Sequence, residues 1–339
     1  MVSHDSSEGR VNLTLAGRAF APSKSRIVLI GGGVMGPGIA LSFADAGFEV
    51  DLCDTSPSAL EAGMQALRDA QQLKIDLGLS PEGSLEAVCS RVSAHTFVDQ
   101  ILADTALVIE AVSENRAVKA AVFEKIGAFA PRDAVIWSNT STLNVFELAG
   151  PSVIERLLVA HWFAPPHIMP LVEVVASEQT RIGLQDEAIA ILSALGKVPV
   201  ALNKFIPGFI INRLLRALGR EAFHMIETGV ITPAALDIAV RTSLAPRMQL
   251  LGVMQRYDYT GLNLSLRNLR DPDILDAPVD REPASITKLV AEGHHGVTTG
   301  RGFYDYGERS NLQLLRERDA RLWRIVQSLG DLVANPEPI

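Results

Sequence analysis

The feature that most constrains this 339-residue chain is the glycine motif G-x-G-x-x-G formed by Gly31, Gly33 and Gly36. A short β-branched apolar run, residues 27–30, comes directly before it, and a helix-competent segment follows. In such a strand–turn–helix unit the first glycine allows a tight turn. The second lets the backbone approach a pyrophosphate, and the third lets helix and strand pack closely. Because the start of the helix also offers unpaired N–H groups, the motif predicts a dinucleotide-binding turn.

Asp54 ends the second predicted strand and provides the acid that accompanies such a turn. A carboxylate at this place accepts hydrogen bonds from the adenosine ribose and repels a 2′-phosphate, and the next residue is Thr55 rather than an arginine. We therefore expect NAD as the cofactor, bound by the three glycines, by Val34 and Met35 within the motif, and by Asp54. The alternative role for Asp54 is a strand-end turn or a helix cap.

The order of the predicted elements indicates an α/β fold. Short apolar runs that suit buried strands alternate with helix-competent segments, which predicts a doubly wound parallel sheet. After Pro207-Gly208 the apolar residues recur with a helical period and little strand signal remains, so we expect an all-α C-terminal domain. The strand-like runs that follow the first are 49–53, 107–109, 135–137, 157–159 and 171–175.

Three regions follow from this pattern. Residues 1–24 are polar and aperiodic and are expected to form a disordered extension, and residues 25–206 are expected to form the dinucleotide-binding domain. Residues 207–339 are expected to form a helical domain for substrate binding and dimerisation. The amphipathic segments 209–226 and 312–329 carry more apolar surface than one small domain readily buries, which predicts a homodimer.

Composition excludes several classes of protein. The formal net charge is −8 and lysines and arginines are not clustered, so a nucleic-acid partner is not expected. No stretch approaches the ~18 consecutive apolar residues of a membrane span, and no signal peptide is evident, so we expect a cytoplasmic protein that does not bind a membrane. Cys53 and Cys89 form no C-x-x-C pair and no compact zinc motif is present, so neither a disulfide framework nor a metal site is expected.

Four further motifs follow the glycine turn. In chain order they are Ser-Asn-Thr-Ser at 138–141, His-Trp-Phe at 161–163, Leu-Val-Glu-Val-Val at 171–175 and Pro-Gly-Phe-Ile-Ile-Asn-Arg at 207–213. With these motifs the chain, roughly from Arg26 to Tyr306, resembles the 3-hydroxyacyl-CoA dehydrogenase family. The resemblance implies a helical domain that usually dimerises, and hydride transfer from the 3-hydroxyl of a 3-hydroxyacyl-CoA to NAD in fatty acid metabolism.

The resemblance also implies a catalytic pair, with His161 as the base and Glu173 as its carboxylate partner. Oxidising an alcohol requires a group that takes a proton, and a neutral imidazole suits this task near pH 7. A carboxylate on the other ring nitrogen fixes the tautomer and stabilises the imidazolium. Because Pro165 and Pro166 follow His161, a hairpin-like return could bring Glu173 beside it. The alternative is a buried structural histidine and a surface glutamate.

Four other positions gain roles from the resemblance. Ser141 and Asn212 are expected to bind the oxygen atoms of the substrate, and Glu114 and Lys119 are expected to line the cofactor site together with Ser141. Ser141 follows a predicted strand end, where ligands gather in open α/β sheets. The alternative role of Ser141 and Asn212 is local helix capping.

Several residues depart from the family pattern. Ala164 stands where the family usually has asparagine, and Thr298 stands where a lysine is common. The helical segment after Asp54, which helps to hold the nucleotide part of coenzyme A in the family, has only Arg68 and Lys74 as basic residues. These departures remove polar or charged groups expected near the cofactor or substrate. The sequence therefore supports NAD as the cofactor more firmly than it supports the family's usual substrate.

Other functions therefore stay open. The His-Trp-Phe-x-Pro-Pro-His form of residues 161–167 resembles a branch that acts on free hydroxy acids or aryl substrates, so an NAD-dependent dehydrogenase without coenzyme A is the first alternative. A nucleotide-binding protein that has lost catalysis is the second. A metal hydrolase using His161, His167 and Glu173 lacks a compact zinc motif, and a serine hydrolase lacks the G-x-S-x-G elbow.

Overall fold

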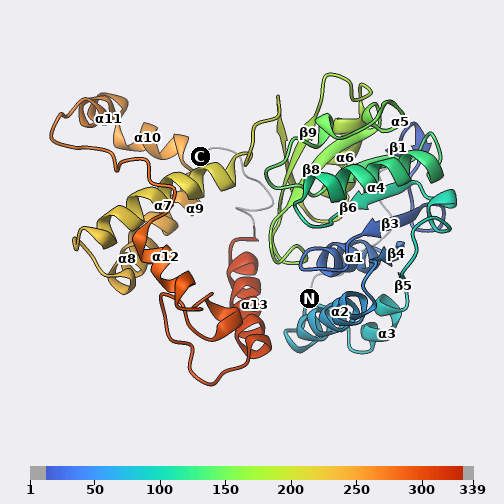
Figure 1. Ribbon diagram of the computed structural model, residues 1–339, viewed down its shortest axis with the longest axis horizontal. Coiled ribbons are helices and arrows are strands. Elements are labelled where there is room, and N and C mark those ends of the chain that lie inside the picture. Colours follow the sequence, from blue (N-terminus) through green and yellow to red (C-terminus); the bar gives the residue numbers. More distant parts are fainter. Residues whose placement is uncertain (1–12, 331–339) are drawn as a thin grey trace. The chain divides into compact units, whose positions relative to one another are not determined.

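The computed structural model describes residues 13–330 and divides the chain into two compact units after Phe209 (Figure 1). The first unit contains the glycine turn and the main sheet, and the second is built from helices. The expected domain boundary at residues 206 and 207 lies close to this division. Within residues 13–330, the structure has no helix long and apolar enough to cross a membrane.

An eight-stranded sheet forms the centre of the first unit, in the order β10-β9-β8-β7-β6-β3-β4-β5. Neighbouring strands pair in parallel except β8 and β9, which are antiparallel. The predicted parallel sheet is therefore confirmed, with one reversal near an edge. The strands are β3 (Arg26–Ile30), β4 (Glu49–Cys53), β5 (Val92–His95), β6 (Leu107–Glu110), β7 (Val135–Ser138), β8 (Leu157–Trp162), β9 (Leu171–Ala176) and β10 (Val198–Leu202).

The two edge strands, β5 and β10, are the ones that the sequence pattern does not predict. Ser93 and Ala94 of β5 are exposed, and so are Val200 and Ala201 of β10, which also contains Pro199. Edge strands are covered on fewer sides and tolerate proline, so they need no continuous apolar run. The pattern for buried strands therefore passes over them.

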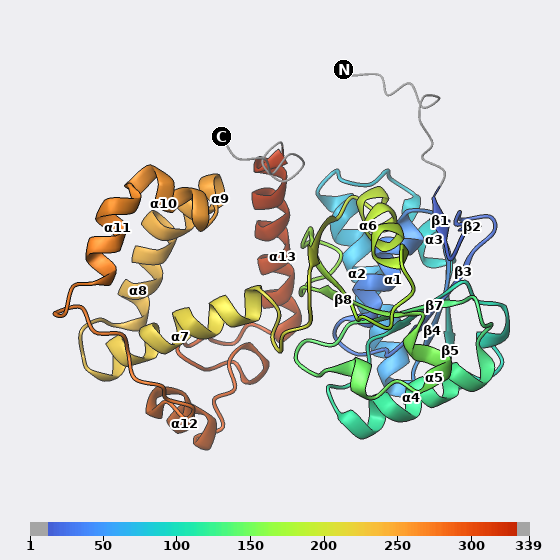
Figure 2. The ribbon, with the colours of Figure 1, turned by 90° about the horizontal axis from the view of Figure 1, so that it is seen from above.

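Helices cover both faces of the sheet. Ile27 and Leu29 of β3 join a core cluster with residues of α1, α2, α3 and α6, while Val28 and Ile30 join a second cluster with residues of α4 and α5. Figure 2 shows these two groups of helices on opposite sides of the sheet. The helices are α1 (Gly36–Asp45), α2 (Pro57–Asp76), α3 (Ser84–Cys89), α4 (Arg116–Phe129), α5 (Pro151–Ile154) and α6 (Leu184–Ala194), with short 3-10 turns η1 (Leu102–Asp104) and η2 (Val145–Glu147).

A short hairpin precedes the sheet and corrects one expectation. Strands β1 (Thr14–Leu15) and β2 (Arg18–Ala19) pair antiparallel, and Leu15 and Phe20 are buried in the core. The carboxylate of Glu187 in α6 accepts hydrogen bonds from the Ala16 and Gly17 N–H groups at 2.7 and 3.2 Å. The expectation of a disordered extension over residues 1–24 is therefore wrong for residues 13–24, because their few apolar side chains reach the core. Residues 1–12 lie outside the described part of the chain.

The second unit confirms the predicted all-α C-terminal domain. Its described residues include only two buried ones, Ser265 and Ala277, although its helices carry many leucines. The helices are α7 (Ile211–Glu227), α8 (Pro233–Ala239), α9 (Ala245–Leu251), α10 (Met254–Thr260), α11 (Leu262–Leu269), α12 (Ala284–Ala291) and α13 (Asn311–Ser328), with a π-helical turn η3 (Val240–Leu244) and a 3-10 turn η4 (Val297–Thr299).

Candidate active site

The glycine turn lies between β3 and α1 and is closed on one side and open on the other. At Gly31 φ is +123°, and a Cβ atom there would lie 2.4 Å from the carbonyl oxygen of Ala111. A Cβ atom at Gly36 would lie 1.9 Å from the carbonyl oxygen of Gly31. A side chain is therefore excluded at both positions. A Cβ atom at Gly33 would meet no atom within 4 Å, so the backbone is bare where a ligand can approach it.

The other loop residues leave this approach open. Val34 is 87% exposed, and Met35 immediately precedes the first turn of α1, which starts with Gly36 and Pro37. The N–H groups of that turn are available for an anion. A bare turn that leads into a helix N-terminus fits the pyrophosphate of a dinucleotide.

Asp54 follows β4 and lies beside the same turn. Its Oδ2 accepts a hydrogen bond from the Gly32 N–H at 2.8 Å, and its Oδ1 accepts one from the Ser56 N–H at 2.9 Å. The helix cap of α2 is Ser56, whose hydroxyl accepts from the Ala59 N–H at 3.2 Å. Asp54 therefore holds the glycine turn without capping α2, and its oxygens have lone pairs left for ribose hydroxyl groups.

His161 and Glu173 lie directly opposite each other on β8 and β9, the antiparallel pair of the sheet. The distance from His161 Nδ1 to Glu173 Oε2 is 2.8 Å, and the residues are 5% and 0% exposed. A carboxylate only accepts hydrogen bonds, so Nδ1 carries the proton and Nε2 is left as the basic nitrogen. The structure thus brings the two predicted residues into contact, with the imidazole held in one tautomer.

The pair lies at the edge of the sheet where ligands gather. His161 is near the carboxyl end of β8, the glycine turn follows β3, and Asp54 follows β4. These strands run in the same direction, so their carboxyl ends share one edge of the sheet. In open α/β sheets this edge holds the ligand.

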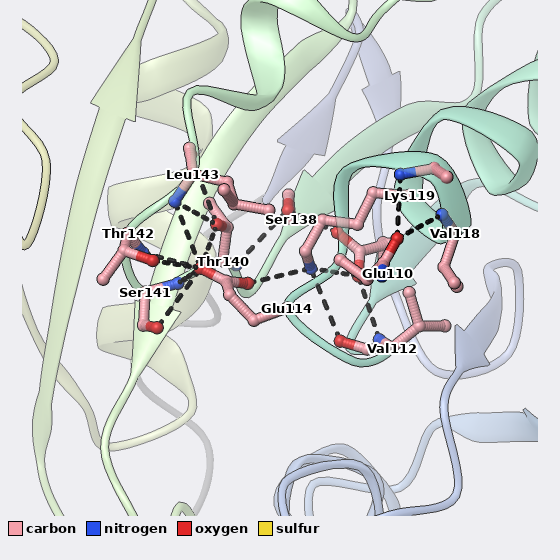
Figure 3. Close-up of polar contacts among 12 residues, drawn as sticks. Glu110, Val112, Glu114, Val118, Lys119, Ser138, Thr140, Ser141, Thr142 and Leu143 are labelled. Carbon is pink, nitrogen blue, oxygen red and sulfur yellow. Dashed lines mark hydrogen bonds and ion pairs between the residues drawn. The ribbon is translucent and has the colours of Figure 1, made fainter.

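Glu114 collects hydrogen bonds from the loop that follows β7 (Figure 3). Its Oε1 accepts from the N–H groups of Ser141, Thr142 and Leu143 at 3.0, 2.7 and 3.1 Å, and from the Thr140 hydroxyl at 2.8 Å. Burial opposes ionisation of this carboxyl group. The hydrogen bonds and the charge of Lys119 outweigh burial and lower the pKa of Glu114 to about 2. Glu114 is therefore an anion that fixes the backbone around Ser141.

Lys119 is buried beneath this loop, with its side chain 1% exposed. Its Nζ lies 2.7 Å from Glu110 Oε1 and 3.3 Å from Glu114 Oε2. The other oxygen of Glu110 accepts from the Ser138 hydroxyl at 2.5 Å. Both carboxylates thus compensate the buried ammonium group. Ser138 belongs to the Ser-Asn-Thr-Ser motif, but its partner Glu110 lies outside the sequence motifs. A signal for Glu110 existed, because this acidic residue directly follows the predicted strand 107–109.

Comparison with known proteins decides the family. The model of the 3-hydroxyacyl-CoA dehydrogenase NAD binding domain matches residues 26–205, and the model of the 3-hydroxyacyl-CoA dehydrogenase C-terminal domain matches residues 208–306. The chain belongs to the 3-hydroxyacyl-CoA dehydrogenase family. It is accordingly an NAD-dependent oxidoreductase, as the sequence motifs predict, and the glycine turn and Asp54 are suited to this cofactor.

Relatives within this family differ in substrate. The chain is 33% identical over 307 residues to 5-formyl-3-hydroxy-2-methylpyridine 4-carboxylate 5-dehydrogenase of Mesorhizobium japonicum, covering 87% of this chain and 95% of the relative. It is 33% identical over 290 residues to a probable 3-hydroxybutyryl-CoA dehydrogenase of Bacillus subtilis, covering 84% and 99%. A crystal structure of the pyridine carboxylate enzyme, described as an NAD⁺-dependent dismutase, aligns with a TM-score of 0.79 at 29% identity, covering 91% of this chain and 99% of that one.

Ser141 and Asn212, the two residues predicted to bind the substrate, belong to different units. Ser141 lies in the loop after β7, and its hydroxyl is 3.3 Å from Glu114 Oε1. Asn212 is in the first turn of α7 in the second unit. Neither caps a helix, because Asn144 precedes η2 and Ile210 precedes α7. The capping alternative is thus removed, and the substrate-binding roles of both residues stay predictions.

Lys197 is a buried lysine that the family motifs do not include. Its Nζ donates to the carbonyl oxygens of Pro166 and Met169 at 2.6 and 3.2 Å, and it lies 5.3 Å from the centre of the Trp162 ring. Both carbonyl groups belong to the connection between β8 and β9. Burial, and then the charge of Lys74, lower the pKa of Lys197 to about 8. Lys197 thus braces the connection that returns the chain from His161 toward Glu173.

Proposed function

We propose that this enzyme oxidises a hydroxyl group of a small carboxylate substrate that is not carried by coenzyme A, with His161 as the base and Glu173 as its partner. The observation that carries the catalytic assignment is the buried hydrogen bond of 2.8 Å between His161 Nδ1 and Glu173 Oε2. It leaves Nε2 as a base of defined orientation at the ligand-binding edge of the sheet. Free imidazole has no such constraint on either its tautomer or its direction.

Each residue then has a definite task. Nε2 of His161 takes the proton of the substrate hydroxyl group, and the charge of Glu173 stabilises the imidazolium that results. Bound NAD would supply the acceptor for the hydride of the carbon that carries this hydroxyl group. Ser141 and Asn212 bind the substrate oxygens, the first from the loop that Glu114 fixes and the second from α7.

For the cofactor we propose contacts from Gly31, Gly33, Val34, Met35 and Gly36 to the pyrophosphate and from Asp54 to the adenosine ribose. Glu114 and Ser141 would line the cofactor site. Lys119 acts through Glu114 rather than on the cofactor itself, because its ammonium group is buried between two carboxylates.

The charges of α2 support a substrate without coenzyme A. Its two basic residues are both engaged: Lys74 pairs with Asp45, and Arg68 lies 2.8 Å from Glu86. The helix also carries three acidic residues, so its formal charge is −1. A 3′-phosphate at this helix would meet no uncommitted cation of α2. A free carboxylate substrate has no 3′-phosphate and therefore needs no cation of α2.

Two other observations agree with this substrate class. Ala164 and Thr298 replace the asparagine and lysine that the family usually has, and Thr298 directs its hydroxyl to its own turn, 3.4 Å from the His295 carbonyl oxygen. The relative in Mesorhizobium japonicum is named for a pyridine carboxylate. We infer that this chain uses the family chemistry on a free carboxylate, of the hydroxy acid or aryl type.

We also propose that the enzyme is a homodimer. The second unit exposes leucines along α7, including Leu214, Leu215 and Leu218 at 41%, 57% and 47%. A surface of this kind is typical of a protein–protein contact. We choose a second copy of the chain as the partner, because symmetric pairs are the commonest assemblies.

A substrate panel tests the proposal. NADH formation is followed with 3-hydroxyacyl-CoA thioesters, the corresponding free hydroxy acids and aromatic carboxylates that bear a hydroxymethyl or formyl group, with His161→Ala as the blank. We expect turnover with free acids and at least about tenfold lower kcat/KM with thioesters of the same acid. Preference for the thioester would overturn the substrate class and restore the acyl-CoA function. NAD binding without turnover of any substrate would support the lapsed protein.

A further inference from the structure

Phe209 has an unusual backbone conformation for a bulky residue. Its φ is +47°, in the left-handed region, and Gly208 before it has a φ of +80°. Among the described residues, Ala16 is the one other non-glycine residue with positive φ. A side chain with a Cβ atom is disfavoured there, so surrounding contacts must hold it. Such conformations gather at functional sites, which makes the surroundings of Phe209 informative.

The contacts that hold Phe209 lead to the catalytic histidine. Phe209 is 1% exposed, and its N–H donates to the carbonyl oxygen of Ile206 at 3.0 Å. Its ring lies edge-on to Phe205, with centroids 5.6 Å apart and planes at 89°. The same ring lies 5.2 Å from the centre of the His161 imidazole, with planes at 39°. The strained turn therefore places an aromatic ring against the proposed base.

His161 has a second aromatic neighbour. The Phe163 ring lies 4.6 Å from the imidazole centre at an interplanar angle of 59°. The hydrogen bond to Glu173 fixes one ring atom, Nδ1, but allows the imidazole to tilt about that contact. Two aromatic rings in contact with the imidazole restrict this tilt and keep water from its faces. Position and tautomer are thus set by different residues.

We propose that Phe209 is a positioning residue for His161, and that its left-handed backbone is kept because it presents the ring to the imidazole. This inference rests on the proposed role of His161 as the base. Phe209 is the last residue of the first unit, and α7 with Asn212 begins two residues later. One turn therefore both orients the proposed base and starts the helix that bears a proposed substrate ligand.

The test compares Phe209→Leu with Phe205→Leu. Both remove an aromatic ring from the same cluster, but Phe205 contacts Phe209 and has no ring contact with His161 among the described residues. Leucine also retains the Cβ atom, so the backbone strain is unchanged at position 209. Phe209→Met, which fills a similar volume with a flexible chain, replaces Phe209→Leu if that variant does not fold.

The first readout needs no substrate. Diethyl pyrocarbonate acylates neutral imidazole, and peptide mapping gives the rate at His161 separately from the other histidines. We expect the Phe209 variant to change this rate at least threefold and the Phe205 variant to leave it within about 1.5-fold. Equal rates in the wild type and both variants would overturn the positioning role, whether or not His161 is the base.

The second readout is turnover with the best substrate of the panel. A displaced base lowers kcat by about 10- to 100-fold while NAD affinity stays unchanged. A purely structural Phe209 would lower the melting temperature of both variants and leave kcat unchanged in both, which would overturn the proposal. If His161→Ala itself turns over normally, the proposed function fails, and the acylation rates still decide whether Phe209 orients the ring.

Discussion

The two units of this enzyme differ in where their apolar side chains go. In the first unit the sheet is covered on both faces, and every residue of β3 after Arg26 is at most 6% exposed. In the second unit, helices with a clear apolar period bury only Ser265 and Ala277 among the described residues. A helical period thus predicts that a face will be covered, but the cover can come from outside the unit.

The two units also differ in which candidate functional residues they carry and in how these are supported. The first unit has a core that supports the glycine turn, Asp54 and the pair His161–Glu173 without help from other chains. The second unit carries Asn212 and exposes leucines along α7, which we propose to be covered by a second copy of the chain. We therefore expect its helices to depend on assembly for their stability, whereas the first unit depends on its own core.

The largest effect is expected from removing the apolar face of α7. Leu214 and Leu218 lie one turn apart on this helix, so the double change to serine removes four leucines from a symmetric dimer. Leu214 and Leu218 are 41% and 47% exposed, so association can bury only about half of each side chain. At roughly half of the 1.5–3 kcal/mol for full burial, association loses about 3–6 kcal/mol, which favours monomers. Sedimentation velocity measures the result, with Ile182→Ser in the first unit, 99% exposed, as control. A double variant that sediments like the wild type would remove α7 from the interface.

The next largest effect is expected from His161 in the first unit, and it is compared with that of Asn212 in the second. His161→Ala should lower kcat by about 10²–10⁴-fold, the usual contribution of a general base, with NAD affinity nearly unchanged. Asn212→Ala, in the second unit, removes the proposed substrate contact and should raise KM more than it lowers kcat. Steady-state kinetics and cofactor titration by fluorescence measure both variants. A folded His161→Ala enzyme with normal kcat would contradict the mechanism.

A matched pair of leucines compares the cores. Leu29 on β3 is 0% exposed, so Leu29→Ala should cost about 2–5 kcal/mol in the free energy of unfolding. Leu275 in the second unit is 83% exposed, and its change to alanine should stay within about 0.5 kcal/mol. Urea unfolding at fixed protein concentration measures both. Similar losses would mean that Leu275 is covered by the partner, which would extend the interface beyond α7.

The smallest effect concerns Glu114 and pH. The pKa of Glu114 is lowered from 4.5 to about 2 in the folded protein, so its anion stabilises the fold above pH 4.5 and this stability is lost as the pH falls toward 2. Glu114→Gln should therefore cost on the order of 2 kcal/mol at pH 7, and less at pH 3.5. Urea midpoints of both proteins at the two pH values test this. If the stability difference between the wild type and Glu114→Gln is the same at both pH values, the loss of stability comes from hydrogen bonds alone.

The sequence predicted the features that local backbone space or burial on both faces determines. Gly31 and Gly36 leave no room for a Cβ atom, and the strands near the sheet centre are apolar because both faces are covered. The edge strands β5 and β10 were not predicted, because they are partly exposed and lack a continuous apolar run. The hairpin at 14–19 was not predicted, because a distant residue, Glu187, binds it. Lys197 was not predicted either, because its partners are backbone carbonyl groups of a distant segment, which leave no pattern in the sequence.

The site shows the same division. The motifs name His161 and Glu173, but their contact depends on the antiparallel register of β8 and β9, which the chain pattern only suggests. The left-handed turn at Phe209 has no signal of its own, because a phenylalanine in a turn reads as an ordinary apolar residue. Its role emerges only with its neighbours in place.

The register of β8 and β9 has a consequence for how this enzyme can vary. Side chains alternate between the faces of a strand, so inserting or deleting one residue within either strand would turn His161 and Glu173 to opposite faces. A change of length in the connection between the strands leaves the register intact. The connection between β8 and β9 can therefore be lengthened or shortened in the course of evolution while the pair is inherited unaltered.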